Sequence, residues 1–334
     1  MKPMPDLRPI IASLRAEGST GLVRRRVDPA SSLDVYLGTD VAGTQLGVML
    51  AVPHRLVPLQ KDLPTGAGFA VKQHAVKYDA KGIVSLCVFC TDTASEDIFL
   101  HFMEDLVSHL LAETGHELGV RTFLARVDLW QRFFVAGGVA YLSEELQCGL
   151  FAELLILRDL VIPAVGLSAG VDGWHGPEGS PQDFVLAGGA VEVKCSRAKA
   201  GGRIAISNEQ QLDERPFPHL VLIYVAVTLG GGTNPSLSDI VPEIRSLLAA
   251  SGRPLGIFND QLITAGWLDA HAGHYSENRF FVREVRFFAI RDDFPRILPG
   301  DFPSGVIEIT YKLDLTAMLP FEVEKAVVEG WLKT

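Results

Sequence analysis

The chain has 334 residues, of which 48% are hydrophobic and 21% are charged, and its formal net charge at pH 7 is −10. This is the composition of a globular protein long enough for a large core and for two or three domains. No third of the chain is basic, which argues against a free-standing, non-specific DNA-binding protein but leaves room for a local basic groove or a metal-dependent enzyme.

The sequence has no stretch of about 18 uncharged apolar residues, and its first residues lack the apolar core of a signal segment. We therefore expect a cytoplasmic protein with no membrane partner. The four cysteines are few and scattered, which favours reduced thiols. Cys87 and Cys90 match the C-x-x-C pattern of some zinc sites. Because they lie in an apolar strand-like run without a second pair, we expect them to pack in the core.

Residues 1–115 are expected to form a β-rich domain. Apolar runs bounded by turn residues predict strands at 33–37, 45–52, 68–76 and 83–89. Apolar side chains at helical spacing over 96–112 predict the helix that closes this domain.

Residues 116–232 are expected to form a second domain, which begins with helices at 119–135 and 143–161. Ser143 is a typical N-cap residue followed by two acids, a pattern that favours a helix start. Glu153 falls on an apolar stripe of the second helix, together with Leu146, Leu150, Leu157 and Leu160. A carboxylate on a buried seam is costly unless it is paired or metal-bound, so Glu153 is either a ligand or the partner of an arginine.

The segment from Asp183 to Lys194 carries most of the functional information. It is predicted to be a β-hairpin, with Gly188-Gly189 as a two-residue turn of the type that needs positive φ twice. In this register Val185 faces Glu192, and Asp183 faces Lys194. Alternate residues of a strand share a face, and cross-strand partners share it too. One aspartate, one glutamate and one lysine are therefore expected on one patch of the sheet.

Two carboxylates on one patch can hold a hard divalent cation, and a neighbouring ammonium can position a water molecule or help to deprotonate it. Asp183, Glu192 and Lys194 therefore predict metal-assisted hydrolysis. The alternative is a solvated hairpin face with a surface ion pair. The almost continuously apolar strand at 220–227 disfavours this alternative, because such a run belongs in the middle of a covered sheet.

Residues 233–334 are expected to form an α/β extension that packs on the second domain. Helical spacing and apolar runs predict helices at 237–249, 259–270 and 321–332 and strands at 279–290 and 305–313.

The order of elements in the second domain is a helix with Glu153, a hairpin with Asp183 and Glu192, a third strand, a short helix at 208–213 with Gln211, and the apolar strand. This order resembles the α-β-β-β-α-β core of the PD-(D/E)XK nucleases, the restriction-endonuclease-like superfamily. It implies an α+β fold, in which a mixed β-sheet flanked by helices forms the nuclease-like core between the β-rich domain and the extension.

The chain looks most like a bacterial family of PD-(D/E)XK proteins that occurs in restriction-like defence operons. The similarity covers most of residues 140–315 and is carried by Gly149-Leu-Phe-Ala-Glu153, Gly173-Trp-His-Gly-Pro177, Gln182-Asp183-Phe184, Ala190-Val-Glu192-Val-Lys194, Gln211-Leu-Asp213, Phe294-Pro-Arg-Ile297 and Tyr311-Lys-Leu-Asp314. The Pro-Asp pair of the family name is represented by Pro181-Gln182-Asp183, with one residue inserted.

The resemblance implies a role for each polar residue of the site. Asp183, Glu192 and the Val193 carbonyl are expected to hold Mg²⁺, for which Mn²⁺ can substitute. Lys194 is expected to position the attacking water and to stabilise charge on the phosphate. Glu153 would hold a second ion or a water molecule, and Gln211 would orient the phosphate or the water. Contacts with the DNA backbone are expected from the basic residues beyond the hairpin, Arg197, Lys199, Arg203 and Arg296.

The function that follows is a Mg²⁺-dependent DNA endonuclease of a bacterial restriction-type anti-phage defence system. Its expected partners are DNA and the helicase, ATPase and methyltransferase proteins of such an operon. A homodimer is expected by analogy, because double-strand cleavage by one such site usually needs two copies. The alternative is a catalytically silent nuclease-fold subunit that binds DNA or partner proteins. A glycosidase-like or esterase-like hydrolase is disfavoured, because paired glycosidase acids need no lysine two residues along the strand.

Overall fold

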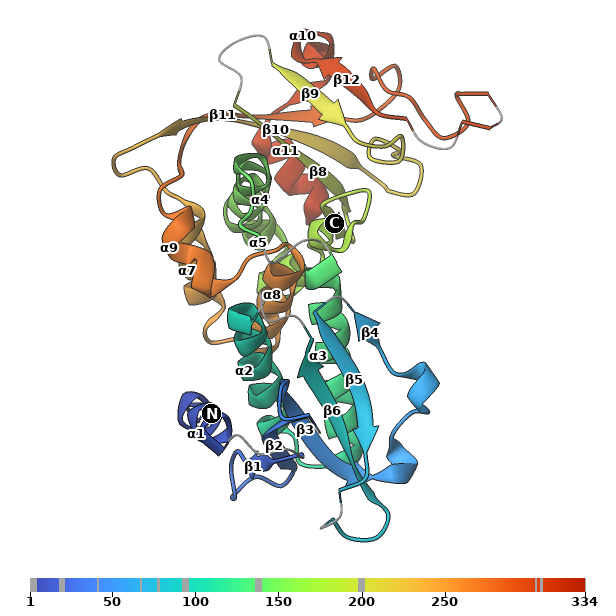
Figure 1. Ribbon diagram of the computed structural model, residues 1–334. Helices are drawn as coiled ribbons and strands as arrows, with labels where there is room; N and C mark the ends of the chain where they lie inside the picture. The colour runs from blue at the N-terminus through green and yellow to red at the C-terminus, as the bar shows by residue number, and fades with distance from the viewer. Residues whose placement is uncertain are drawn as a thin grey trace. The chain divides into compact units, whose positions relative to one another are not determined.

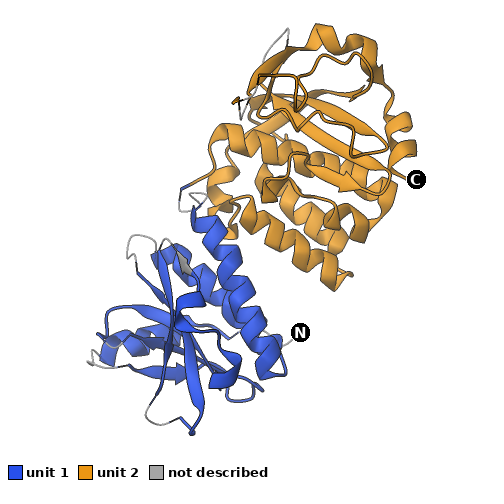
Figure 2. Ribbon diagram, turned by 90° about the vertical axis from the view of Figure 1, so that its right-hand side faces the viewer, with its two compact units in different colours: residues 1–140 blue, residues 141–334 orange. Residues whose placement is uncertain are grey.

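The computed structural model describes residues 5–17, 22–40, 42–66, 68–76, 79–91, 96–135, 140–197, 202–303, 305–306 and 309–333 (Figure 1). The chain divides into two compact units, which are unit 1, residues 1–140, and unit 2, residues 141–334 (Figure 2). Both units combine helices with sheets, so the fold is α+β as expected. Among the described residues, no helix is both long enough and apolar enough to cross a bilayer.

Unit 1 is an antiparallel sheet with helices packed against it. Its described strands follow the order β1-β2-β3-β6-β5-β4, and their bounds are β1 Arg24–Arg26, β2 Asp34–Thr39, β3 Leu46–Pro53, β4 Thr65–Gly66, β5 Phe69–His74 and β6 Ile83–Cys90. Helices α2 (Glu96–Ala112) and α3 (His116–Val135) both pack against β3, and α1 (Arg8–Glu17) packs against β2. The buried face of α2 explains the apolar spacing of its sequence.

Unit 2 contains the hairpin and the remaining elements. Its helices are α4 (Glu144–Ile156), α5 (Ile162–Val165), α6 (Leu167–Asp172), α7 (Leu237–Leu248), α8 (Gly252–Thr264), α9 (Ala272–Tyr275), α10 (Leu315–Met318) and α11 (Lys325–Leu332). Its strands are β7 (Phe184–Leu186), β8 (Gly189–Ser196), β9 (Arg203–Ile206), β10 (Leu220–Gly230), β11 (Arg279–Ala289), β12 (Tyr311–Asp314) and β13 (Glu322–Val323). A π-helical turn, Leu157–Val161, joins α4 to α5.

The division at residue 140 differs from the boundaries expected at 115 and 232. Helix α3 belongs to unit 1 because it packs on α2 and β3. The expected core and extension form one unit because β11 pairs with β10 along almost its whole length. Sequence composition does not show this pairing, since helices α7, α8 and α9 separate the two strands along the chain.

The main sheet of unit 2 has the strand order β13-β11-β10-β8-β7. Strands β8 and β10 are parallel, and the other neighbours are antiparallel. Strand β10 lies in the middle of the sheet and is buried over its first eight residues, as its apolar sequence predicts. Because neighbouring residues point to opposite faces, β10 contributes to two cores.

Each face of this sheet has its own cover. Val191, Val193 and Val221 pack on one face with residues of α4 and α7. The opposite face holds Leu222 and Tyr224 and is covered by β9, β12 and α10, with β9 and β12 forming a separate small sheet. Figure 1 shows α4 and the β9–β12 pair on opposite sides of the strands. Residues 190, 192 and 194 share a face with Leu222, because Leu222 pairs with Glu192.

The hairpin differs from its predicted register by two residues. Leu186 pairs with Gly189, so the turn residues are Ala187 and Gly188, not the two glycines. Of the two glycines, Gly188 and Gly189, only Gly189 has a positive φ, at 152°. Gly188 is required for another reason, since a Cβ there would lie 2.0 Å from the Trp331 carbonyl oxygen. A slip of two residues leaves every side chain on its predicted face, so the expected convergence survives.

The short helix predicted at 208–213 is wrong. Residues 208–212 form hydrogen-bonded turns, in which the Asn208 side chain accepts from the amides of Gln210 and Gln211. Asparagine side chains commonly compete with the backbone in this way and favour turns over helices. The chain therefore departs from the α-β-β-β-α-β order at this element.

Two of the four cysteines are not free thiols. Cys148 of α4 and Cys195 of β8 form a disulfide, so the expectation that all four are reduced is wrong for this pair. The sequence did not indicate it because the residues are 47 positions apart and meet only when α4 packs on the sheet. Cys87 and Cys90 are buried and take no part in this disulfide, which confirms the expected core packing.

Reduction of the disulfide is expected to destabilise unit 2 by about 4 kcal/mol, because the bond closes a loop of 47 residues and so restricts the unfolded chain. Urea unfolding with and without dithiothreitol measures the difference. The Cys148→Ser, Cys195→Ser double variant serves as the control and should be insensitive to the reductant. Equal midpoints for the oxidised and reduced chains would contradict a stabilising bond.

Candidate active site

Helix α4 supplies Glu153. The helix starts where predicted, since the Ser143 side chain caps it by accepting from the Leu146 amide. The apolar stripe is only partly buried, because Leu146 is 59% exposed. Leu150, at 5%, is buried as expected. Glu153 itself is partly buried and faces the loop after α6, and it has no arginine partner among the described interactions.

Asp183 lies directly before the edge strand β7. Its carbonyl accepts from the amides of His175 and Gly176, at 2.8 Å and 3.0 Å, which ties it to the preceding loop. Its carboxylate Oδ2 accepts from the amide of Val193 at 2.7 Å. The contact seen for Val193 is thus through its N–H. A ligand role for its carbonyl stays a prediction.

Glu192, Lys194 and Gln211 form a connected row. Nζ of Lys194 lies 2.7 Å from Oε1 of Glu192 and donates to Oε1 of Gln211 at 3.0 Å. The same Gln211 oxygen accepts from the Ser207 amide at 2.9 Å. Glu192 is only 1% exposed, and its second oxygen, Oε2, has no hydrogen-bond partner. The turn therefore places Gln211 beside Lys194 without a helix.

Glu153 and Asp183 approach each other at Gly176. A Cβ built at this glycine would lie 2.6 Å from Oε2 of Glu153 and 2.8 Å from Oδ1 of Asp183. Any side chain at this position would displace one of the two carboxylates. Asp183 directly precedes the edge strand β7, so it lies at an end of this strand. Helix α4 packs on one face of the sheet and can therefore bring the Glu153 carboxylate to the same end.

The electrostatics of the site follow from three acids with one ammonium. Burial and the nearby Asp183 carboxylate raise the pKa of Glu153 to about 8. Burial raises the pKa of Asp183 to about 6, against the opposing hydrogen bond from Val193. The pKa of Glu192 is raised well above its ordinary value by burial and by Asp183. Burial therefore disfavours the ionised form of all three acids, and the Asp183 carboxylate disfavours it further at Glu153 and Glu192.

The donor set suits a hard divalent cation. Among the described residues, no three acidic, histidine or cysteine side chains already form a metal-binding cluster. The chemistry nevertheless fits, because the candidate side-chain donors are carboxylate oxygens and the buried Oε2 of Glu192 has no other partner. A glycine at position 176 also leaves room beside two of the acids. Asp183, Glu192 and Glu153 are the residues that would hold such an ion.

The basic residues expected to contact DNA have different surroundings. Arg197 is 41% exposed on its side chain and pairs with Glu144. Arg203 is exposed at the start of β9. Lys199 lies outside the described residues. Arg296 is buried, with a side chain 7% exposed that pairs with Glu214, so its guanidinium stabilises the fold and is not presented to a phosphate. Burial of this pair depends on packing that the sequence does not reveal.

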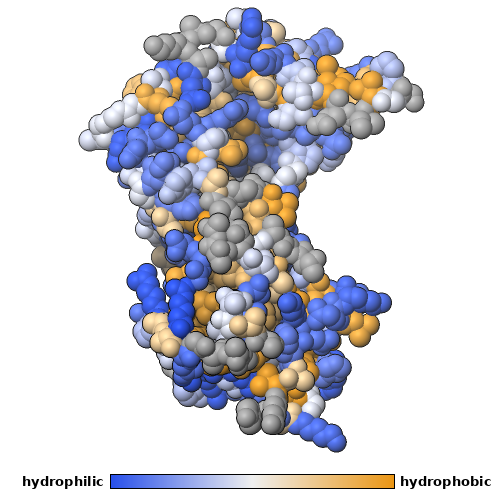
Figure 3. All heavy atoms as spheres, in the orientation of Figure 1, coloured by the Kyte–Doolittle hydropathy of each residue, from blue (hydrophilic) through white to orange (hydrophobic). Residues whose placement is uncertain are grey.

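A recess lies in unit 2. Its volume is about 280 Å³, and Gln182 and Gln210, the residues directly before Asp183 and Gln211, belong to its wall. The lining is otherwise mostly proline and aromatic, and its residues are Pro181, Gln182, Gln210, Asp213, Pro216, Phe217 and Pro299. The upper part of Figure 3, which is unit 2, presents mainly hydrophilic side chains.

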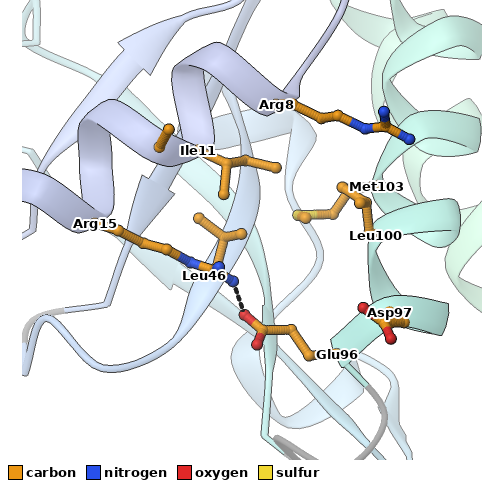
Figure 4. A pocket seen from close by; sticks show the side chains of 9 residues that line it. Arg8, Ile11, Arg15, Leu46, Glu96, Asp97, Leu100 and Met103 are labelled. Carbon is orange, nitrogen blue, oxygen red and sulfur yellow. Dashed lines mark hydrogen bonds and ion pairs between the residues drawn. The ribbon is translucent and has the colours of Figure 1, made fainter.

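Unit 1 has a cavity of similar size with different chemistry. It measures about 280 Å³ and lies between α1 and α2 (Figure 4). Ile11, Leu46 and Met103 give it an apolar lining, and Arg15 forms an ion pair with Glu96 at its edge. Its acids are thus at least partly neutralised by arginine. Three neighbouring acids that share one lysine lie in unit 2, and the candidate active site is placed there.

The structure adds residues that the site prediction did not include. Trp174 donates from its indole Nε1 to Oε2 of Glu153 at 2.8 Å. Gly176 gives both acids their room. Gln182 is buried and donates to the carbonyls of Gln210 and Gln211, which holds the turn against the start of the hairpin. Trp174 and Gly176 lie in the Gly173–Pro177 motif, so a family resemblance signalled the segment but not the contacts.

Comparison with known proteins identifies the family. The model of the family described as "Putative PD-(D/E)XK family member, (DUF4420)" matches residues 10–316, which is most of the chain. No curated protein and no solved structure matches. The match spans both units and includes Glu153, Asp183, Glu192, Lys194 and Gln211. The suspected superfamily is thereby confirmed, and the chain belongs to this PD-(D/E)XK family.

Proposed function

We propose that the protein is a Mg²⁺-dependent DNA endonuclease, and that it is the nuclease component of a restriction-type defence system. One observation carries the proposal. Glu153 of α4, Asp183 before β7, and Glu192 and Lys194 of β8 lie together, with interacting carboxylates and a salt bridge of 2.7 Å. Few structural roles require one buried acid and two partly buried acids around one lysine, because burial of unbalanced charge is costly.

The three acids would hold the ion. When bound, Mg²⁺ supplies a Lewis acid that stabilises negative charge on a phosphodiester and lowers the pKa of water. Asp183 is fixed by its hydrogen bond from the Val193 amide, so its other oxygen, Oδ1, keeps a defined direction. Glu192 contributes the unpartnered Oε2. Glu153 adds a third carboxylate on the far side of Gly176.

Lys194 and Gln211 would act on the reacting phosphate and water. The ammonium of Lys194 is held by two oxygens, at 2.7 Å and 3.0 Å, so it is preorganised for the charge that develops in the transition state. Gln211 holds Lys194 through Oε1, and its amide Nε2 remains a donor for phosphate or water. Arg197, Lys199 and Arg203 would contact the DNA backbone. Arg296 is no longer proposed for this role.

The wider setting of the activity is proposed from the family. Restriction-like operons would supply the helicase, ATPase and methyltransferase partners, and a homodimer would supply two sites for a double-strand break. The protein would act in the cytoplasm. Mn²⁺ would replace Mg²⁺, since it prefers the same oxygen donors.

A second candidate function is a nuclease-fold subunit that binds DNA or partner proteins without cutting. The specific observations that favour it are the net charge of −10 and the acids that pair with Arg197 and Arg296. These pairings occupy two of the basic side chains that were expected to contact DNA. The presence of all four residues Glu153, Asp183, Glu192 and Lys194 favours the nuclease.

The proposed function predicts that the chain nicks or cuts supercoiled plasmid DNA with Mg²⁺ or Mn²⁺ and that Asp183→Asn abolishes this cleavage. The substitution removes a negative charge from the ion site while it preserves shape. In a calorimetric titration with Mn²⁺, Asp183→Asn is expected to bind more than about 10-fold more weakly, because even outer-shell changes cost this much.

Asp172→Asn is the matched control, because Asp172 lies on α6 and pairs with Arg253 outside the acid cluster. This variant should bind and cleave like the unsubstituted chain. If the unsubstituted chain, with its operon partners present, leaves plasmid intact under every divalent metal, the binding subunit is the correct function. Identical Mn²⁺ curves for Asp183→Asn and the unsubstituted chain would remove Asp183 from the ion site.

A further inference from the structure

Trp174 is the described side chain outside the acid cluster that donates directly to Glu153. It lies between α6 and the 3₁₀ turn at Gly176–Glu178, and it is fully buried. Its indole Nε1–H donates to Oε2 of Glu153 at 2.8 Å. A buried indole needs an acceptor for its N–H, and here that acceptor is a candidate ligand of the ion.

The indole is held from several directions. Its backbone forms a bridge with Phe184, the first residue of β7. Its carbonyl accepts from Nε2 of Gln261 on α8 at 3.0 Å, and its ring packs 5.8 Å from that of Phe258 on the same helix. Helix α8 and the edge strand therefore fix the donor before any ligand arrives. A residue that orients a metal ligand must itself be held rigidly, and Trp174 meets this condition.

The two residues after Trp174 fix the other acid. The amides of His175 and Gly176 both donate to the carbonyl of Asp183. Gly176 also lies against Oε2 of Glu153 and Oδ1 of Asp183. The segment 174–176 thus contacts the Glu153 carboxylate through the indole and holds the main chain of Asp183 through two amides. Both acids are therefore tied to the same short segment.

We infer that Trp174 is a positioning residue that orients the Glu153 carboxylate toward Asp183 for binding of a divalent cation. The inference rests on the proposed function and deepens it, because it names the group that arranges the ion site. Trp174 does not contact the reacting atoms. It acts through Glu153, and its effect should vanish when Glu153 can no longer act as a ligand.

The test is a double-mutant cycle in Mn²⁺ affinity, measured by calorimetry without DNA. Trp174→Phe removes the N–H and keeps an aromatic ring. It should weaken Mn²⁺ binding by about 10-fold, the lower end of outer-shell effects. In a Glu153→Gln background the same change should alter the affinity by less than about twofold, because coupled residues are not additive. An equal loss in both backgrounds would overturn the inference in favour of general packing.

Trp267→Phe is the matched control. Trp267 is buried in the same unit and donates its indole N–H to Asp269 at 2.9 Å, away from the acid cluster. The chemical change is the same, but the acceptor is not a ligand. Trp267→Phe should leave Mn²⁺ affinity unchanged. If it weakens binding as much as Trp174→Phe does, the effect is loss of stability and the inference fails.

A spectroscopic readout tests the contact directly. The chain has four tryptophans, so a ¹⁵N-labelled sample should give four indole N–H signals, and the one absent from Trp174→Phe belongs to Trp174. Mg²⁺ should shift this signal, and Glu153→Gln should shift it in the absence of Mg²⁺. The Trp267 signal should respond to neither. A Trp174 signal that ignores both changes would overturn the inference.

The outcomes separate the inference from the proposed function. Mn²⁺ affinity that depends on Trp174, together with absence of DNA cleavage, would support the inference and reject the nuclease. Suppose that the unsubstituted chain cleaves DNA with Mg²⁺, and that Trp174→Phe binds Mn²⁺ as tightly as the unsubstituted chain does. This result would reject the inference alone. An unsubstituted chain that binds no Mn²⁺ would overturn the role of Trp174 together with the ion site.

Discussion

Replacement of Lys194 by methionine is expected to slow Mg²⁺-dependent DNA cleavage by about 100- to 1,000-fold, the usual cost of one preorganised charge donor. The ammonium is fixed by Glu192 at 2.7 Å and Gln211 at 3.0 Å, so no reorganisation is needed as charge develops on the phosphate. Methionine keeps much of the apolar stem and removes only the charged end. The initial rate of nicking on supercoiled plasmid measures the loss.

Two accompanying measurements separate chemistry from folding and ion binding. Lys194→Met should bind Mn²⁺ at least as tightly as the unsubstituted chain, because the lysine competes with the ion for Glu192. Lys312→Met, an exposed lysine on β12 of the same unit, should cleave normally. Unchanged cleavage by Lys194→Met would remove the ammonium from the mechanism. Loss of Mn²⁺ binding in this variant would show that Lys194 supports the ion site and has no separate role in chemistry.

The convergence of the acids was predictable because it depends on strand geometry. Alternation and pairing place Asp183, Glu192 and Lys194 on one face, and only a slip by an odd number of residues moves them apart. The actual slip is two residues. The position of the turn was less predictable, because Gly188 is selected by a close approach of Trp331, more than 140 residues away.

The contacts that complete the site depend on tertiary packing. Gln211 lies beside Lys194 on a turn and not on the predicted helix, since Asn208 ends the helical alternative with its own side chain. The expected role of Gln211 toward the phosphate or the water stays a prediction. The support of Trp174 by Gln261 joins residues 87 positions apart. Burial of Arg296 against Glu214 joins residues 82 positions apart. A pattern of residue types along the chain contains no signal for pairs of this kind.

A rise in pH from about 5.5 to 8.5 in EDTA is expected to destabilise unit 2, because the folded chain holds protons that the unfolded chain releases. The folded pKa of Glu153 is about 8, above its ordinary value of 4.5, and that of Asp183 is about 6. For a raised pKa, the stabilising contribution is complete below the ordinary value and is lost as pH passes the folded value. The loss is on the order of a few kcal/mol, or about 5 °C or more in melting temperature.

Glu153→Gln isolates the contribution of one acid to this loss. The amide cannot ionise, so this variant should melt above the unsubstituted chain at pH 8.5 in EDTA, and the difference should shrink at pH 5.5. Saturating Mg²⁺ should reverse the order at pH 8.5, because the ion stabilises the ionised carboxylate and has less affinity for the amide.

Glu145→Gln, an exposed glutamate on the same helix, is the matched control and should follow the unsubstituted chain at both pH values. If Glu153→Gln melts below the unsubstituted chain at pH 8.5 in EDTA, the carboxylate is stabilised by the folded protein itself. In that case burial has not raised its pKa, and the site has no unbalanced charge for a cation to neutralise. The melting order at pH 8.5 with and without Mg²⁺ therefore tests the electrostatic basis of the ion site independently of any cleavage assay.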